Sequence, residues 1–454
     1  MPLVSINPTT GQQIAAYPEM SEAEVDAALA SSARAFAEWR RAGFNERGVV
    51  MRAVAQVLRR RKSEFARLMA VEMGKPLAQA EAEIDKCAVT SEYFAEHAAR
   101  FLAAEEVATD AQRSFVTYQP LGVVLGVMPW NFPFWQALRY LAPTLMAGNT
   151  SVLKHSSNVT GCALAIEEVF REAGAPDGLF QTLRLGSKRV ATVVDDPRVA
   201  AVTLTGSTPA GQAIAQQAGR QLKKTVLELG GSDPYVILDD ADLDAAVAIC
   251  VSSRLINSGQ SCVAAKRFIC TPKTSAKVEE LFTALIAAKR MADPLTNPDV
   301  GPQAREDLRD DLDKQVQASI AKGARALVGG KKPSAPGAFY PPTVLAGVRK
   351  GMPAYDEELF GPVAAIIVAA DERDGIRIAN DSPFGLGAAV FTRDIERGTK
   401  IAAEDLEAGN CFVNAFVRSD PRLPFGGVKQ SGYGRELGMW GIREFVNIKT
   451  VWVQ

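Results

Sequence analysis

Apolar residues recur at helical spacing through the first quarter of the chain. Residues 21–110 carry this pattern, which opens with SEAEVDAALASSARAFAEWR. Ser21 stands three residues before Glu24 in this stretch. A serine and a glutamate at that spacing form the capping box that starts many helices. Residues 21–110 are therefore predicted to be mostly helical.

From residue 115 the pattern changes to short β-branched runs separated by proline and glycine. FVTYQPLGVVLGVMPW predicts short strands, and the final FVNIKTVWVQ predicts a C-terminal strand. Apolar runs typical of strands alternate with helical patterns from 150 to about 240, and again from 241 to about 415. Such alternation is typical of parallel sheets covered by helices, so two α/β lobes are expected.

Length and composition narrow the class of protein. The chain has 454 residues, too many for one core of ordinary domain size. Its formal net charge is −1, which gives no basic face for nucleic acid. No apolar run is long enough for a membrane span, and MPLVSINPTTGQQI lacks the pattern of a secretory signal. We expect a cytoplasmic protein without nucleic-acid or membrane partners.

The six cysteines and two histidines limit the chemistry. No cysteine pair has the CxxC spacing, and the positions do not resemble a zinc site, so no metal is expected. Two histidines argue against a Cys-His protease. Catalysis must then use Cys, Glu, Lys and the backbone. The cysteines are Cys87, Cys162, Cys250, Cys262, Cys270 and Cys411.

Cys262 differs from the other cysteines in its surroundings. It lies in GQSCVAAKR, after a helical pattern and a turn-forming NSGQ, near the predicted start of the next element. A helix N-terminus there lowers the pKa of a thiol. The other five lie within or beside apolar runs, where a thiol is usually inert packing. Cys262 is therefore the best candidate nucleophile, with simple packing as the alternative.

Two further stretches carry candidate polar groups. Glu228 lies between leucines in LELGGSDP, where desolvation raises a carboxyl pKa toward the range of a general base; pairing with a lysine is the alternative. VMPWNFPFWQALRY holds Asn131 between two prolines, where its amide donates either to an oxyanion or to the backbone. Arg139 on the same apolar stretch either pairs with a protein carboxylate or binds an anionic ligand.

TLTGSTPAG has the pattern of a strand, a tight turn and a helix. Gly206 and Ser207 lie at the turn, where a helix N-terminus suits a pyrophosphate. The stretch lacks the full GxGxxG pattern, and an ordinary strand–helix joint is the alternative.

Seven stretches of the sequence, some of them already described, occur in an order and spacing that resemble the aldehyde dehydrogenase superfamily. The resemblance runs essentially from end to end. The seven stretches are PWNFP, the lysine of VLKHS, TGSTPAG, ELGGSDP, GQSCVAAKR, EELFGPV and LPFGGVKQSGYGRE. The resemblance implies an α/β fold with a Rossmann-like cofactor domain, an α/β catalytic domain and a β oligomerisation arm, assembled as a homodimer or homotetramer. The boundaries expected are 1–102 and 122–228 for the cofactor domain, 229–432 for the catalytic domain, and 103–121 and 433–454 for the arm.

The resemblance also implies roles for individual residues. Cys262 is expected to attack an aldehyde, with Asn131 and the Cys262 N–H as oxyanion hole. Hydride transfer to a nicotinamide then leaves a thioester. Glu228 is expected to activate water, and its presence favours hydrolysis over transfer to coenzyme A. The cofactor contacts implied or expected are Trp130, Lys154, Ser156, Ser157, Gly206, Ser207, Leu229, Glu358 and Phe360.

The cofactor-binding stretch departs from the family pattern. NAD-preferring members carry a glutamate three residues after the lysine, where this chain reads KHSS and has Ser157. A carboxylate there repels a 2′-phosphate, whereas a serine donates a hydrogen bond to it, and Lys154 adds a positive charge. We therefore expect NADP as the preferred cofactor and NAD as a weaker one.

Substrate contacts follow from the resemblance to bacterial succinate semialdehyde dehydrogenases. Arg139 falls where those relatives hold a distal carboxylate, so the expected substrate is succinate semialdehyde. An aliphatic aldehyde dehydrogenase of broad specificity, with Arg139 paired to a protein carboxylate, is one alternative, and a non-catalytic binding or structural protein of this fold is another. Ala264 stands where many such enzymes carry a second cysteine, so no redox switch is expected. The substrate contacts expected are Phe132, Trp135, Arg139, Ser261 and Ser419.

Overall fold

The computed structural model describes residues 2–454, beginning with a small hairpin and four helices. Ser21 Oγ accepts a hydrogen bond from the Glu24 N–H, and the Glu24 carboxylate accepts one from the Ser21 N–H. This confirms the predicted capping box at the start of the first helix. The elements are β1 (Leu3–Ile6), β2 (Gln13–Tyr17), α1 (Glu22–Trp39), α2 (Phe44–Arg60), α3 (Lys62–Met73) and α4 (Leu77–Phe101).

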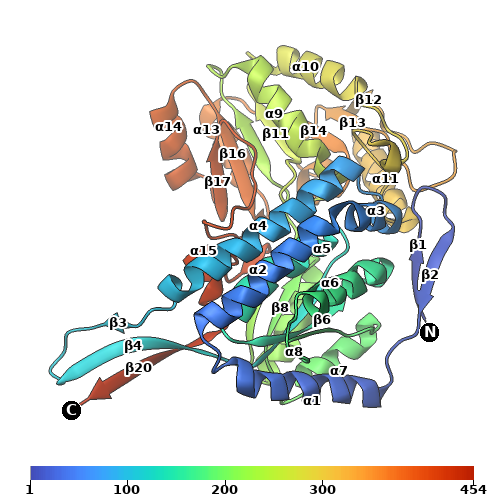
Figure 1. Ribbon diagram of the computed structural model, residues 1–454. Coiled ribbons are helices and arrows are strands. Elements are labelled where there is room, and N and C mark those ends of the chain that lie inside the picture. The colour runs from blue at the N-terminus through green and yellow to red at the C-terminus, as the bar shows by residue number, and fades with distance from the viewer. Residues whose placement is uncertain (1) are drawn as a thin grey trace.

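The first lobe is built on a six-stranded sheet in the order β19-β9-β8-β5-β6-β7, parallel except for β19. One face is covered by α5 and α6, with α2, α3 and α4 behind them; α1, α7 and α8 cover the other (Figure 1). The elements are β5 (Val123–Met128), α5 (Pro133–Met146), β6 (Thr150–His155), α6 (Thr160–Glu172), β7 (Phe180–Thr182), α7 (Val190–Asp195), β8 (Val199–Thr205), α8 (Thr208–Arg220), β9 (Lys224–Glu228) and β19 (Gly432–Tyr433).

The second lobe is built on a seven-stranded sheet in the order β12-β13-β14-β11-β10-β16-β17, with β12 antiparallel. Helices α9 and α10 pack on one face and α11, α12 and α13 on the other. The strands are β10 (Pro234–Ile237), β11 (Arg267–Cys270), β12 (Arg325–Val328), β13 (Thr343–Ala346), β14 (Val363–Val368), β16 (Gly387–Phe391) and β17 (Asn410–Val413). The helices are α9 (Leu243–Leu255), α10 (Ser275–Ala287), α11 (Glu306–Ala321), α12 (Pro353–Asp356), α13 (Glu372–Asn380) and α14 (Ile395–Lys400).

A three-stranded antiparallel arm extends away from the two lobes, and the C-terminus lies at its far end (Figure 1). It pairs β3 (Glu105–Glu106), β4 (Arg113–Pro120) and β20 (Val446–Val453), so the predicted C-terminal strand is confirmed. The short helix α15 (Gly438–Ile442) precedes β20 and contacts α4 and α5.

Two α/β lobes and a β arm confirm the predicted fold class. The expected domain boundaries stay a prediction, and β19 straddles the one placed between residues 432 and 433. A further small antiparallel pair, β15 (Phe384–Gly385) with β18 (Val428–Lys429), joins two late segments of the chain. Within residues 2–454, no helix is both long and apolar enough to cross a membrane.

Candidate active site

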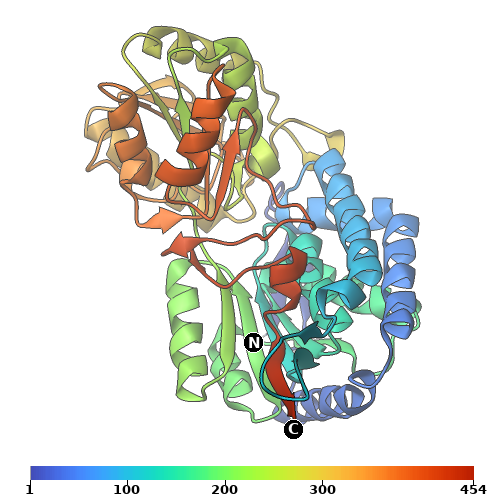
Figure 2. The same ribbon diagram turned by 90° about the vertical axis from the view of Figure 1, so that its left-hand side faces the viewer.

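The two lobes lie one above the other in Figure 2, and the candidate residues come from segments of both lobes. Glu228 is the last residue of β9, and Asn131 lies between β5 and α5, at the carboxyl ends of strands in the first sheet. Cys262 precedes β11, at the amino end of a strand in the second sheet. Ligands of open parallel sheets bind beyond the carboxyl ends of strands, so this junction is a natural place for a site.

Cys262 and Glu228 lie together in a buried position. The Cys262 Sγ is 3.9 Å from the Glu228 Oε2, and the two residues are 9% and 2% exposed. Burial raises the pKa of the Glu228 carboxyl above its usual value, although Arg139 opposes the shift. The expectation of a desolvated carboxylate beside the candidate nucleophile is therefore met, and that carboxylate is a competent proton acceptor.

The surroundings of the thiol differ from the expectation in one respect. No helix begins at Cys262; residues 262–264 form a turn that leads into β11. Burial, and then the negative charge of Glu228, raises the pKa of the Cys262 thiol well above its usual range. The prediction that a helix N-terminus lowers this pKa is wrong. Because the thiolate is the nucleophilic form, a thiol with so high a pKa needs a neighbouring base, and the Glu228 carboxylate is in contact with it.

The loop before Cys262 is held in a strained backbone conformation. Asn257 and Ser258 have φ angles of 52° and 57°, in the left-handed region that non-glycine residues rarely adopt. The Asn257 amide donates to the carbonyl oxygens of Asn131 and Gln260, at 2.6 and 3.1 Å. Such strain persists only where surrounding contacts fix it, and here those contacts join the Cys262 loop to the Asn131 loop.

Lys266 and Arg267 fix the other side of the nucleophile loop. The Lys266 Nζ donates to the carbonyl oxygens of Ser261 and Cys262, at 2.9 and 2.6 Å. The same Nζ forms an ion pair with Glu358 at 3.2 Å, while the Arg267 guanidinium donates to three backbone carbonyls. Both cations thus hold backbone carbonyls on this side of the loop.

Asn131 is placed to act on a substrate oxygen. It is 4% exposed, and its Nδ2 donates to the Gln260 carbonyl oxygen at 3.1 Å. An amide nitrogen has two hydrogens, so this bond leaves one donor uncommitted. The arrangement suits an oxyanion hole, in which a fixed donor waits for charge to develop.

Arg139 is already paired with protein carboxylates. Its guanidinium lies 3.0 Å from the Glu228 Oε2 and 2.5 Å from the Glu436 Oε2, and it donates to the Thr205 hydroxyl at 3.0 Å. Of the two roles that the sequence left open, the structure shows pairing. Its expected contact with a distal carboxylate stays a prediction, and the two buried carboxylates that share its charge would be neighbours of that contact.

Glu436 was not expected at the site. It reaches Arg139 because an isolated β-bridge pairs it with Phe425, and burial raises the pKa of its carboxyl to about 7 against the opposing charge of Arg139. Its position within LPFGGVKQSGYGRE carries no signal of this contact, since the two partners are far apart in the chain.

Two residues expected at the cofactor, Lys154 and Ser207, lie at the carboxyl ends of β6 and β8. Lys154 is 9% exposed, and its ammonium forms no ion pair with any carboxylate in residues 2–454. Burial lowers its pKa. Ser207 stands exposed at the N-cap of α8, and its hydroxyl makes no capping bond, so the helix N-terminus keeps free N–H donors. An unpaired buried cation and an open helix N-terminus both fit an anionic cofactor.

The other expected cofactor residues line the same junction. Ser156 and Ser157 are half-buried and follow β6 directly, while Gly206 joins β8 to α8. Leu229 packs so closely on Gly211 that a Cβ there would lie 2.5 Å from its side chain, which brings α8 against the strand end. Trp130 and Phe360 meet edge to face at 5.7 Å, and Glu358 accepts a hydrogen bond from the Gly231 N–H.

Comparison with known proteins agrees with this geometry. The sequence pattern of the aldehyde dehydrogenase family matches residues 2–451. The chain belongs to the aldehyde dehydrogenase family. A probable NADP-dependent succinate-semialdehyde dehydrogenase from Synechocystis is 48% identical over 454 residues and covers 100% of both chains. An Escherichia coli relative, named a succinate semialdehyde dehydrogenase using NAD(P)+, is 47% identical and covers 99% of this chain and 97% of its own.

A solved structure extends the comparison to three dimensions. The succinic semialdehyde dehydrogenase from Streptococcus pyogenes, crystallised with NADP+, matches with a TM-score of 0.97. It is 37% identical in sequence, and the match covers 99% of each chain. The expected membership of the aldehyde dehydrogenase superfamily is therefore confirmed.

In this aldehyde dehydrogenase, Cys262 opens on a cavity of about 400 Å³. Phe132, Trp135, Arg139, Ser261 and Ser419, the five expected substrate contacts, all line it. Lys86 and Phe425 line it as well, although the sequence analysis did not select them. Lys86 lies on α4, far from every family motif, and only its position in the fold brings it to the cavity.

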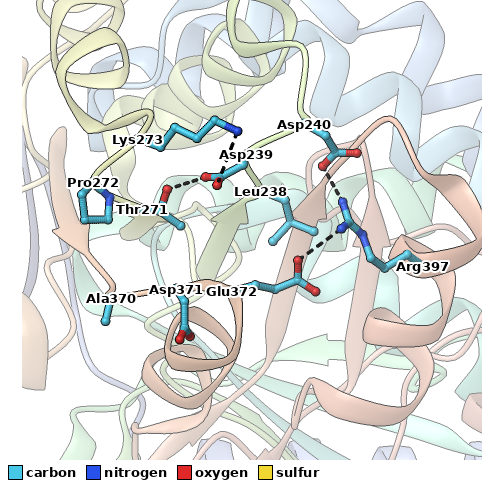
Figure 3. Close-up of a pocket in the computed structure, with 10 residues that line it drawn as sticks. All are labelled: Leu238, Asp239, Asp240, Thr271, Pro272, Lys273, Ala370, Asp371, Glu372 and Arg397. Atoms are coloured by element: carbon cyan, nitrogen blue, oxygen red, sulfur yellow. Dashed lines mark hydrogen bonds and ion pairs between the residues drawn. The ribbon is translucent and has the colours of Figure 1, made fainter.

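A second cavity, of about 470 Å³, lies at the opposite edge of the second sheet, beyond the carboxyl ends of β10, β11 and β14 (Figure 3). Both of its cations are paired with carboxylates. Arg397 pairs with Asp240 at 2.6 Å and Glu372 at 3.4 Å, and Lys273 pairs with Asp239 at 3.9 Å. No cysteine lines this cavity, whereas Cys262 lines the other.

Proposed function

We propose that this aldehyde dehydrogenase oxidises succinate semialdehyde to succinate, with NADP as preferred cofactor, a covalent Cys262 thioester and water as acyl acceptor. The observation that carries the chemistry is the buried contact of 3.9 Å between the Cys262 Sγ and the Glu228 Oε2, beside the spare amide donor of Asn131. The names of the Synechocystis and Escherichia coli relatives support the substrate.

The first half of the reaction forms the thioester. Glu228 accepts the thiol proton, and the Cys262 sulfur attacks the carbonyl carbon of the aldehyde. The resulting oxyanion accepts hydrogen bonds from the Asn131 Nδ2 and the Cys262 backbone N–H. The nicotinamide ring, when bound, supplies the hydride acceptor. Cys262 is then left as a thioester of the substrate acid.

The second half releases the acid. Once the thiol proton has left the site, Glu228 accepts a proton from a water molecule, which attacks the thioester carbon. Asn131 again stabilises the oxyanion, and collapse of the tetrahedral species breaks the bond to the Cys262 sulfur. The raised pKa of Glu228 suits this second role, because a base works best when its pKa approaches the operating pH.

Preference for NADP rests on Ser157 and Lys154. Ser157 begins the 3-10 turn of residues Ser157–Val159, directly after the strand that carries Lys154. A hydroxyl and an unpaired ammonium accept a 2′-phosphate, and a carboxylate at 157 would repel it. Some use of NAD follows, since NAD lacks only the 2′-phosphate and keeps the other contacts, and the name of the Escherichia coli relative includes both cofactors.

The assembly of the enzyme is also a proposal. The first lobe binds the cofactor and the second carries the nucleophile, while the arm, residues 103–121 with the C-terminal strand, joins subunits into a homodimer or homotetramer. Exposed Ile448 and Trp452 on the arm support this role, because solvent-facing apolar clusters mark interaction surfaces.

One observation favours a second candidate function. Because Arg139 is paired with Glu228 and Glu436, a dehydrogenase that oxidises uncharged aliphatic aldehydes is compatible with this arrangement. The cavity is also largely apolar, with Phe132, Trp135 and Phe425 among its walls.

Initial rates separate the two candidates. We expect succinate semialdehyde to give a kcat/KM at least about tenfold above that of butanal, which has the same carbon number but no carboxylate. NADP should exceed NAD for both substrates, and Cys262→Ala should abolish turnover, which also excludes a non-catalytic protein. A higher kcat/KM for butanal would favour the broad-specificity enzyme.

A further inference from the structure

Lys266 is a buried lysine that contacts both the nucleophile loop and a residue expected at the cofactor. It is 2% exposed, and its Nζ donates to the carbonyl oxygens of Ser261 and Cys262 and pairs with Glu358. An ammonium has three donor hydrogens, so these three acceptors use all of them. Each acceptor is therefore held in a fixed place relative to the other two.

The backbone of Lys266 is fixed within the second sheet. Its N–H donates to the carbonyl oxygen of Asp233 at 3.0 Å, and its own carbonyl oxygen accepts from the Ala365 N–H at 3.1 Å. Asp233 directly precedes β10 and Ala365 lies on β14, the two strands that flank β11. The lysine side chain thus starts from a rigid point, and the groups bound to its ammonium take their positions from the sheet.

Glu358 has one carboxylate oxygen committed to the protein and one that is free. Its Oε1 accepts a hydrogen bond from the Gly231 N–H at 3.1 Å and pairs with the Lys266 Nζ at 3.2 Å. Its Oε2 accepts no hydrogen bond from residues 2–454. The Lys266 Nζ also lies 5.9 Å from the centre of the Phe360 ring, which is likewise expected at the cofactor. One ammonium therefore joins the nucleophile loop to a carboxylate that keeps an oxygen for the cofactor.

Four charged side chains act on the Cys262 thiol. Burial raises the pKa of this thiol, and the carboxylates of Glu228 and Glu358 add to the rise. The positive charges of Arg139 and Lys266 oppose it. The charge of Arg139 is shared by two buried carboxylates, whereas Lys266 pairs with one. Lys266 is therefore a cation that favours the reactive, ionised form of the nucleophile.

We propose that Lys266 is a positioning residue that fixes the Cys262 nucleophile relative to the cofactor carboxylate Glu358 and stabilises the thiolate by its charge. The inference rests on the proposed function, which gives Cys262 and Glu358 their roles. Lys266 acts through these two residues and does not itself react. A displacement of about 1 Å in a reacting group can cost on the order of 100-fold in rate, so a link of this kind affects kcat more than KM.

Alkylation of the cofactor-free enzyme by iodoacetamide measures the thiolate without turnover. The Cys262 sulfur displaces iodide, and the rate follows the fraction of thiolate. Lys266→Met keeps the length of the side chain but removes its charge, so we expect the rate constant to fall roughly 3- to 10-fold between about pH 7 and 9. Glu358→Gln removes a negative charge, so its rate constant should rise by a similar factor. Mass spectrometry of the peptide that contains Cys262 identifies the alkylated site.

Turnover gives a second readout for the same variant. With succinate semialdehyde and NADP, Lys266→Met should lower kcat roughly 10- to 100-fold, while the KM for the aldehyde stays within a few-fold of wild type. This division between kcat and KM is expected of a residue that orients reacting groups and leaves substrate contacts intact.

The matched control is Lys223→Met. The Lys223 Nζ also donates to two backbone carbonyl oxygens, those of Val194 and Asp196, both at 2.6 Å. Lys223 directly precedes β9, at the opposite end of the strand from Glu228. Its replacement removes the same kind of contact far from the thiol, so neither the alkylation rate nor kcat should change.

The two variants of the site change the rate in opposite directions only if charge acts on the thiol. A Lys266→Met enzyme that unfolds at the wild-type temperature and is alkylated at the wild-type rate overturns the inference. An unchanged or lower rate in Glu358→Gln also overturns it, and this variant decides the question alone if Lys266→Met does not fold. Absence of turnover in the wild type would overturn the proposed function separately, because alkylation needs neither aldehyde nor cofactor.

Discussion

At the scale of single residues, the catalytic centre contains two buried carboxyl groups that share one guanidinium. Arg139 contacts Glu228 on one side and Glu436 on the other, and all three are at most 5% exposed. One positive charge cannot fully compensate two desolvated carboxylates, so the pKa of each carboxyl lies above its usual value. Protonation of the base is therefore linked to a residue that does not touch the nucleophile.

Removing the second carboxylate tests this link. In Glu436→Gln, the whole charge of Arg139 stabilises ionised Glu228, so the pKa of Glu228 falls. Because Glu228 acts as a base only when ionised, the acid limb of kcat should move to lower pH, by roughly half a unit to one unit over a profile from about pH 5 to 8. A limb that stays in place or moves to higher pH would show that the carboxyl groups are not linked through Arg139.

Ser157 governs the choice of cofactor in the proposed function. Ser157→Glu puts a carboxylate where a 2′-phosphate is expected, and like charges at close range cost several kcal/mol. The ratio of kcat/KM for NADP to that for NAD should fall by roughly 100-fold, measured by initial rates with one aldehyde. Ser157→Ala, which removes only the hydroxyl, should lower the ratio a few-fold. Wild-type preference for NAD would refute the assignment.

At the scale of elements, the start of α5 is fixed by a buried ion pair. The Glu83 Oε1 of α4 accepts hydrogen bonds from the N–H groups of Phe134 and Trp135, both at 2.9 Å. These are donors that the first turn of a helix leaves without intrahelical partners. The other oxygen of Glu83 pairs with fully buried Lys75. Since Asn131 stands just before α5, this junction sets the position of the oxyanion donor.

Glu83→Gln should therefore destabilise the enzyme strongly. Glutamine still offers an oxygen to α5, but Lys75 is left as an unpaired charge in the interior, where loss of a partner typically costs about 3–5 kcal/mol. Thermal unfolding should show a clear fall in Tm, and the double variant Lys75→Met/Glu83→Gln should recover part of it. The exposed pair of Arg59 and Glu92 supplies the control, because Glu92→Gln should cost under about 1 kcal/mol. Equal stabilities of Glu83→Gln and wild type would contradict this account.

Local patterns were sufficient for the elements and for much of the site. Helical spacing and the Ser21–Glu24 box predicted the N-terminal helices, and strand–helix alternation predicted two α/β lobes. The groups that the sequence missed, such as Glu436 and Lys86, make contacts across long separations. Lys86 and Ser419 are 333 residues apart, and neither stretch signals the other. The periodicity of apolar residues reports only which residues share a face of one element, whereas these contacts form only in the folded molecule.

At the scale of the whole molecule, the active site depends on both lobes. The first sheet supplies Glu228 and the loop of Asn131, and the segment leading into the second sheet supplies Cys262. Near its C-terminal end the chain returns to the first sheet, where β19 pairs with β9. An isolated β-bridge there joins Phe425 to Glu436. These returns place Glu436 on Arg139, so the position of one lobe on the other is part of the catalytic geometry.

The arm extends this dependence beyond a single chain. Ile448 and Trp452 are 62% and 49% exposed and stand four residues apart on β20, so they share one face of the strand. We expect this face to be covered by a second copy of the chain. Ile448→Glu/Trp452→Glu should therefore shift the protein, in size-exclusion chromatography with light scattering, from an oligomer to the mass of one chain. Lys449→Glu, on the opposite face, should leave the mass unchanged.

The position of the arm gives this prediction a consequence for activity. β20 follows α15, and α15 contacts α5, the helix that begins beside Asn131. We expect subunit contacts to stabilise the contact of α15 with α5. The dissociated variant should then keep its cofactor preference, but its kcat should fall together with its Tm, because the start of α5 becomes less rigid. A variant that stays oligomeric would assign the interface to another surface. If the wild-type enzyme has the mass of a single chain, the arm does not join subunits.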